Sequence, residues 1–139
     1  MLTKILLIML FSLPTMALEE CNVGTIEFTN KQKKIQKKMS FCFDQDKRDK
    51  YIYSKNCKGL KCKPLLLPEK RPVDISKYKF SVGSPGFKVC RELKGSPQII
   101  KYQLGKDKKW NQSARCIFDD ETFVSTNLLF KIWKGLIIK

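Results

Sequence analysis

Six cysteines in a short chain restrict the fold more than any other feature. The 139-residue sequence carries them at Cys21, Cys42, Cys57, Cys62, Cys90 and Cys116. In an exported chain of this length, an even number of cysteines predicts up to three disulfides, because the core is limited and the environment is oxidising. Roughly fifteen pairings are then open. A four-cysteine zinc site is the alternative, but it usually needs Cys-x-x-Cys pairs, and the only short spacing here is Cys57 to Cys62.

The first residues predict export. Lys4 precedes an apolar run over residues 5–13, and the small residues Thr15 and Ala17 come just before a suitable cleavage point. The run is too short for a final membrane anchor. We therefore expect residues 1–17 to be a secretory signal peptide and the mature chain to lie in the periplasm or outside the cell. An uncleaved anchor or a core helix is the alternative.

The charge balance is strongly basic, and the chain has no histidine. The sequence has 28 Lys or Arg and 13 Asp or Glu, a formal net charge of +15, and loss of the leader removes only Lys4. Without imidazole there is no Ser-His-Asp or Cys-His catalytic unit and no histidine metal ligand. Glycine-rich phosphate loops and nucleophile-elbow motifs are also missing from the sequence. We expect no enzymatic activity, no cofactor and no metal.

A proline-rich segment divides the chain. Residues 63–72 hold three of the six prolines, which interrupt helices and central strands. We expect an N-terminal β-rich half, residues 18–72, and a C-terminal α+β half, residues 73–139. The two halves together have the length of one domain and can pack as one.

Two segments of the N-terminal half alternate apolar and polar residues. Residues 24–28 and 35–43 therefore predict strands that flank a polar turn. If Phe28 faces Ile35, the register brings Cys21 opposite Cys42 on one face. The other face then carries the apolar residues Ile26, Phe28, Ile35, Met39 and Phe41.

A third strand is expected over residues 51–53. It would fold back so that Tyr51 and Tyr53 share the face of Phe41 and Phe43. The next two cysteines, in the segment that follows, would by default close a small loop of their own.

The C-terminal half predicts helices around two strands. Ser84 can cap a helix that has Pro85 at its first position. Strands are expected over residues 98–104 and 110–118, with a short extended piece at Phe123. A last helix, capped at residue 125, 126 or 127, carries Leu128, Leu129, Ile132, Trp133 and Leu136. The fold class is thus α+β: small antiparallel β-sheets with a short helix and a C-terminal helix, stabilised by disulfides.

Two blocks in this half have a distinctive spacing. Cys90 follows Pro85 by five residues and Gly95 follows Cys90 by five, and a later block runs from Cys116 to Thr122 with the sequence Cys-Ile-Phe-Asp-Asp-Glu-Thr. Over residues 83–134 the chain resembles a small family of exported bacterial domains of unknown function that carries a haemolysin label. That family has Asn-Pro-Ala at its helix start and Cys-x-Phe-Pro-Asp-Gly-Ser in the strand.

The chain departs from the family pattern at four positions, which hold Ser84, Gly86, Ser96 and Glu121. Glu121 occupies the usual turn glycine, so a looser hairpin is expected there. The resemblance implies a disulfide between Cys90 and Cys116 that ties helix to strand. It implies no reaction, because the family has no established catalytic residues.

A lysine cluster is the candidate anion-binding site. Its members occupy five of eight consecutive positions and are Lys31, Lys33, Lys34, Lys37 and Lys38. Such a cluster can attract phosphate or anionic lipid, and the alternative is a solvated hairpin tip that keeps the protein soluble. Because 24 of the 28 basic residues are lysine, the charge favours diffuse attraction over sequence-specific nucleic-acid recognition. An anionic surface such as lipopolysaccharide, anionic lipid or another polyanion is the expected partner.

The end of the chain has the composition of an interfacial membrane helix. Lysines alternate there with bulky apolar residues, of which Phe130, Trp133 and Leu136 are the candidate membrane contacts. We prefer the alternative, a core helix packed over the sheet, because a small domain needs such a face.

The sequence thus predicts a small exported, cationic, non-enzymatic domain that binds an anionic envelope or extracellular partner. The first alternative is a membrane-active, haemolysin-like factor that uses the C-terminal helix. The second is a secreted hydrolase that uses carboxylates, although the three adjacent acids at residues 119–121 fit a turn better than a catalytic pair.

Overall fold

The computed structural model describes residues 19–44, 51–66, 84–119 and 122–134. The predicted signal peptide, residues 1–17, lies outside these ranges. In chain order the described elements are β1 (Glu19–Asn30), β2 (Lys33–Asp44), β3 (Ile52–Ser54), the 3-10 helix η1 (Lys55–Leu60), α1 (Lys63–Leu66), α2 (Pro85–Glu92), β4 (Ser96–Leu104), β5 (Asn111–Ile117), β6 (Phe123–Ser125) and α3 (Thr126–Trp133). Helices and antiparallel strands together confirm the α+β class.

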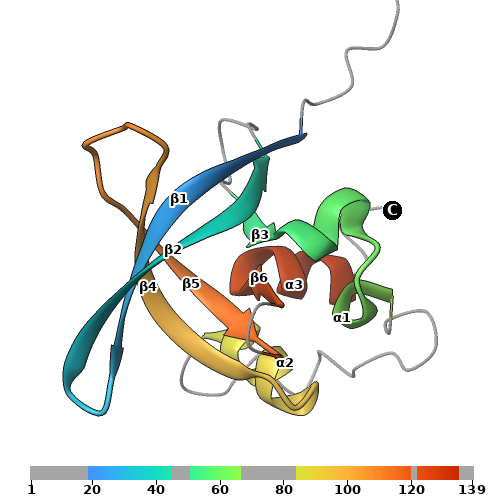
Figure 1. The fold of residues 1–139 in the computed structure, drawn as a ribbon. Helices are drawn as coiled ribbons and strands as arrows, with labels where there is room; N and C mark the ends of the chain where they lie inside the picture. Colours follow the sequence, from blue (N-terminus) through green and yellow to red (C-terminus); the bar gives the residue numbers. More distant parts are fainter. Residues whose placement is uncertain (1–18, 45–50, 67–83, 120–121, 135–139) are drawn as a thin grey trace, which may run out of the picture.

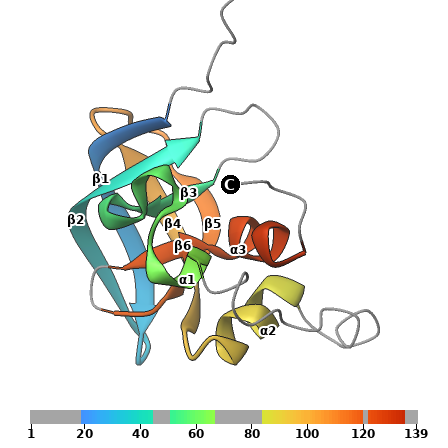
Figure 2. The same cartoon turned by 90° about the vertical axis from the view of Figure 1, so that its right-hand side faces the viewer.

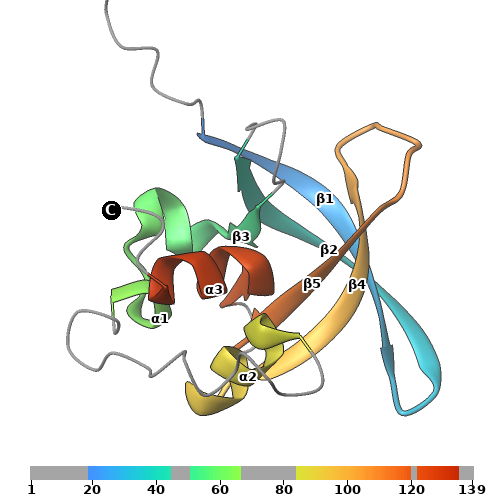
Figure 3. The ribbon, with the colours of Figure 1, turned by 180° about the vertical axis from the view of Figure 1, so that it is seen from behind.

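The six strands form one closed barrel in the order β1-β2-β3-β6-β5-β4, and β4 pairs back onto β1. Every neighbouring pair is antiparallel. Figures 1 and 3 show the helices on one side of this barrel, while the end of the β1–β2 hairpin projects on the other. The expectation of several small sheets therefore needs correction, because the described strands belong to a single sheet.

Closure joins the two halves of the sequence. Residues 24–28 of β1 pair with residues 100–104 of β4, and Tyr53 of β3 pairs with Val124 of β6. In both pairings, one residue precedes the proline-rich segment in the sequence and the other follows it. Of that segment, the described part forms α1, whose Pro64 lies in the first turn, where the missing N–H costs no helical hydrogen bond.

The barrel interior is one of two hydrophobic cores. Alternate residues of each strand point inward, and the fully packed ones are Ile26, Phe41, Ile52, Ile100, Tyr102 and Phe123. The ring of Phe41 meets that of Tyr102 edge to face, with centroids 6.0 Å apart. Burial raises the pKa of the Tyr102 phenol above its ordinary value.

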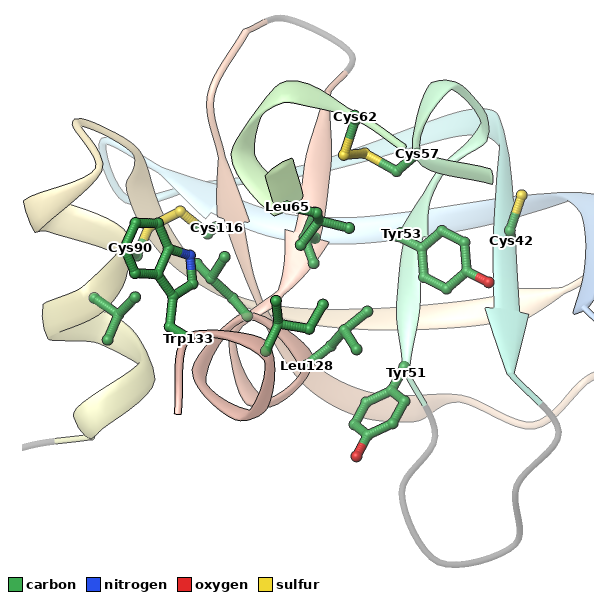
Figure 4. Close-up of a cluster of buried hydrophobic side chains, with 14 residues drawn as sticks. Cys42, Tyr51, Tyr53, Cys57, Cys62, Leu65, Cys90, Cys116, Leu128 and Trp133 are labelled. Carbon is green, nitrogen blue, oxygen red and sulfur yellow. A yellow bond between two sulfur atoms is a disulfide. The ribbon is translucent and has the colours of Figure 1, made fainter. Parts of the chain in front are cut away.

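The second core lies outside the barrel, between its wall and the helices. Figure 4 shows its side chains, which come from β2, β3, η1, α1, α2, β5, β6 and α3. Figure 2, viewed from the helix side, shows α1 and α3 in front of β3 and β6. Because β3 and β6 are covered on both faces, all three residues of each strand are buried.

All three disulfides belong to this outer core. The pairs are Cys21–Cys42, Cys57–Cys62 and Cys90–Cys116, and the cysteines other than the half-buried Cys21 are buried. The expected register is confirmed, since Phe28 pairs with Ile35 and Cys21 with Cys42. The small loop and the helix-to-strand bridge are also present.

The third strand is shifted by one residue from the prediction. Phe43 pairs with Ile52 and Cys42 with Tyr53, so Ile52 enters the barrel while both tyrosines face the outer core. A slip of one residue in a strand moves every side chain to the other face. The tyrosines therefore share the face of Cys42, which corrects the expectation that they share that of Phe41.

The helices begin where the capping residues predicted. Ser84 and Ser125 are the N-cap residues of α2 and α3, although neither side chain caps its helix by a hydrogen bond. The two helices pack closely at Gly86, where an added Cβ would lie 2.6 Å from the carbonyl oxygen of Thr126. Glycine is thus required at this position.

Gly86→Ala should lower the free energy of unfolding by about 1–3 kcal/mol, because the extra methyl group forces the two helices apart. Urea unfolding of the oxidised protein measures this. Arg91→Ala, at an exposed position of the same helix, is the control and should change stability by less than about 0.5 kcal/mol. Equal effects of the two substitutions would contradict the close packing.

When each disulfide is replaced by two alanines, the loss of unfolding free energy should increase with the length of the loop that the disulfide closes. Cys90 and Cys116 are 26 residues apart and Cys57 and Cys62 only 5. Loop-closure entropy predicts that loss of the longer link costs about 1.5 kcal/mol more in unfolding free energy than loss of the shorter one. Urea midpoints and slopes of the two double variants test the order, and a reversed order would refute it.

Candidate functional site

The lysine cluster lies on the β1–β2 hairpin. The two strands pair over their whole length, from Glu19 opposite Asp44 to Asn30 opposite Lys33. Only Lys31 and Gln32 form the turn, and both have positive φ, 46° and 67°. Two-residue turns of this kind favour Asn-Gly, so the two residues at the tip adopt an unfavourable conformation.

Strand alternation divides the predicted cluster between two faces. All five lysines are exposed. Lys33 and Lys37 share one face of β2 with Ile35, whereas Lys34 and Lys38 occupy the opposite face. The structure therefore keeps the cluster on one hairpin but does not bring its ammonium groups onto a single surface.

One hollow collects lysines at the edge of β2. It has a volume of about 550 Å³ and lies where β3 ends and η1 begins. Its lining consists of Lys37, Lys38, Met39, Ser40, Ser54, Lys55 and Asn56. Three of these residues are cationic and none is acidic, but Lys37 already takes part in another interaction, so Lys38 and Lys55 are the cations that favour an anion in the hollow. We call it the β2 edge hollow.

Hydrogen bonds fix the far wall of this hollow. The Ser54 hydroxyl donates to Asn56 Oδ1 at 2.5 Å and accepts from the backbone N–H of Phe123 at 3.0 Å. Asn56 Nδ2 in turn donates to the hydroxyl of Thr122 at 2.5 Å. These bonds connect the residues on both sides of Lys55 to Thr122 and Phe123, at the start of β6. Lys55 was not singled out from the sequence, because the contact depends on where β3 ends.

The opposite side of the hairpin is less favourable for anions. A hollow of about 380 Å³ there contains Lys34 and Lys101, but also Glu27. The Glu27 carboxylate accepts a hydrogen bond of 2.8 Å from Gln36. Its negative charge offsets the nearby ammonium groups. The β2 edge hollow is therefore the stronger candidate anion site.

The candidate membrane residues of the last helix occupy different environments. Trp133 is 7% exposed and packs in the outer core. Phe130 is half-buried at the edge of that core, and Lys134 Nζ lies 5.6 Å from its ring centroid. Leu136 lies outside the described residues. The packed face of α3 is the core face that we preferred from the sequence.

The described ranges contain neither a cluster of metal ligands nor a helix that could span a membrane. Within residues 19–44, 51–66, 84–119 and 122–134, no three His, Cys, Asp or Glu side chains could hold a metal ion together. The helices of these same ranges fall short of what a membrane crossing requires. Of the three adjacent acids, Asp119 is exposed, and residues 120–121 lie outside the description.

A buried arginine was missed by sequence reasoning. Arg115 is 3% exposed and points into the barrel, where its Nε and Nη2 donate to Gln98 Oε1 at 3.0 and 2.9 Å. Its guanidinium carbon lies 5.0 Å from the ring centroid of Phe28 and 5.1 Å from that of Phe123. Burial lowers its pKa to about 10, so it stays charged at neutral pH. Strand alternation could have revealed Arg115. Because Cys116 faces outward to reach Cys90, the residue before it must face inward.

Gln98→Leu should destabilise the protein by about 2 kcal/mol, because it leaves a buried cation without its acceptor. The double variant Arg115→Met/Gln98→Leu should recover most of that loss, since the apolar pair needs no hydrogen bond. A double-mutant cycle by urea unfolding measures both effects. If Gln98→Leu alone is as stable as the parent, the amide does not support the guanidinium.

Comparisons of the chain with protein-family models, curated proteins and solved structures found no match. Its function must therefore be inferred from the barrel, its charge and the β2 edge hollow.

Proposed function

We propose that this chain is an exported, disulfide-stabilised, cationic domain that binds an anionic partner and catalyses no reaction. The observation that carries the proposal is the β2 edge hollow, whose lining includes Lys38 and Lys55 and no acidic residue. A single cavity with this lining is a stronger argument than net charge alone, because charge scattered over a surface serves solubility equally well.

The compartment follows from the covalent framework. Three disulfides are typical of proteins in oxidising surroundings. Together with the leader expected over residues 1–17, they support export to the periplasm or beyond the cell. Anionic envelope components and extracellular polyanions are the partners available there.

The type of cation indicates the kind of binding. Lysine carries a hydrated point charge, whereas arginine makes the paired hydrogen bonds that recognise particular bases or phosphates. The hollow contains lysines and no arginine. Binding should therefore be long-ranged, tolerant of partner sequence and weakened by salt, with a screening length of about 10 Å at 0.1 M.

Charge reversal in the hollow should weaken polyanion binding more than the same reversal elsewhere. Lys38→Glu/Lys55→Glu changes the hollow. Lys106→Glu/Lys108→Glu makes the same change in net charge at two exposed lysines that follow β4. With heparin as the probe, the hollow variant should lose at least about tenfold more affinity and show a shallower salt dependence.

Titrations of heparin and of anionic vesicles at several salt concentrations provide the measurement. Equal losses in the two variants would show that net charge, and not the hollow, governs binding. If the parent protein binds neither probe at low salt, the proposed function is wrong. The lysines would then serve only to keep an exposed edge strand from aggregating.

A further inference from the structure

We infer that the partner of this protein presents an extended acidic polypeptide segment, which adds as a strand to the open edge of β2. This inference rests on the proposed function and names the class of partner for the same site. It concerns residues 33–40 of β2, which we call the open edge.

The open edge exists because β3 is short. β3 pairs with β2 only from Phe43 to Phe41, and at Lys55 the chain turns away into η1. Among the described residues, positions 33–40 pair with β1 on one side and with no strand on the other. All but one of the side chains in this stretch are exposed, and Met39 is half-buried. In such an edge, backbone N–H and C=O groups face outward in alternation.

Alternating donors and acceptors select a polypeptide. A sulfated polysaccharide or a lipid surface can satisfy the ammonium groups, but it cannot pair with a regular series of N–H and C=O groups. Another strand satisfies both. Ile35, 37% exposed, and Met39 add apolar contacts between the lysines on one face.

The lysines define the charge pattern of the segment. Lys34 and Lys38 lie on one face of β2 and Lys33 on the other, so an added strand meets cations on both of its faces. Glu27 of β1, which pairs with Gln36, offsets part of the charge of the first face but leaves two lysines against one carboxylate. Lys37 is left out because it already takes part in another interaction within the protein. Acidic residues directly across from the other three lysines would form cross-strand pairs of opposite charge.

The neighbouring strand supplies the direction. β3 runs antiparallel to β2 along the same side, so a segment that continues its line would also be antiparallel. The β2 edge hollow lies where that line passes from β3 to the open edge, between Ser54 and Ser40. Lys55, at the start of η1, would meet an acidic residue at the end of the segment nearest β3.

Binding of synthetic peptides to the oxidised full chain tests the inference. The matched peptide carries glutamate opposite Lys38, Lys34 and Lys33 in antiparallel register, with threonine or valine elsewhere. A permuted peptide has the same composition with its three glutamates adjacent. Two further peptides carry N-methyl groups on alternate backbone amides, one set facing the edge and the other facing away.

The matched peptide should bind at least about tenfold more tightly than the permuted one, since only it pairs every glutamate across the strand. The peptide whose N-methyl groups face the edge should lose binding, and the peptide whose N-methyl groups face away should keep it. Backbone amides of residues 33–40 should exchange more slowly with solvent when the matched peptide is bound. Lys34→Glu/Lys38→Glu should abolish these effects, whereas the control Lys106→Glu/Lys108→Glu should retain them.

Two other outcomes would overturn the inference in different ways. If all four peptides bind alike while heparin still distinguishes the hollow variant, strand addition is wrong and the proposed function stands. If neither the peptides nor heparin and anionic vesicles bind at low salt, both fail.

Discussion

The structure depends on the two-residue period of its strands, which separates two sets of side chains across the barrel wall. In β2, Phe41 enters the barrel and Cys42 faces out, and in β5 Arg115 enters while Cys116 faces out. The outward set contains Cys21, Cys42 and Cys116. Cys21 and Cys42 pair with each other, and Cys116 pairs with Cys90 of α2, in the layer beneath the helices. A small barrel thereby gains a second core, which combines apolar packing with covalent links.

The same constraint explains where the proposed binding surface lies. The disulfides and helices cover β3, β6 and the adjoining ends of β2 and β5. The rest of β2 extends beyond this covered region and carries most of the cluster lysines. Lysines on an exposed edge strand disfavour self-association, and their charge favours an anionic partner. The proposed partner is one that satisfies both the charge and the unpaired backbone.

Local pattern predicted the hairpin, while closure of the barrel could not be predicted. The pairing of Phe28 with Ile35 and the Cys21–Cys42 bridge followed from alternation and one turn. The pairing of β1 with β4 joins segments that no local signal connects. The side chains of Tyr51 and Tyr53 were assigned to the wrong face. All residues of this short strand are buried, so no alternation of polar and apolar residues marks the inward face. Lys55 entered the candidate site only through the end of β3.

Mapping the disulfides of the protein, produced under oxidising conditions, by proteolysis and mass spectrometry tests whether the cysteines meet in the outer core. The two-layer barrel predicts Cys21 linked to Cys42, Cys57 to Cys62 and Cys90 to Cys116, with no free thiol. Each link requires its cysteines to face the outer core. A bridge between any other two of the six cysteines, or a full set of free thiols, would contradict the two-layer arrangement of barrel interior and outer core.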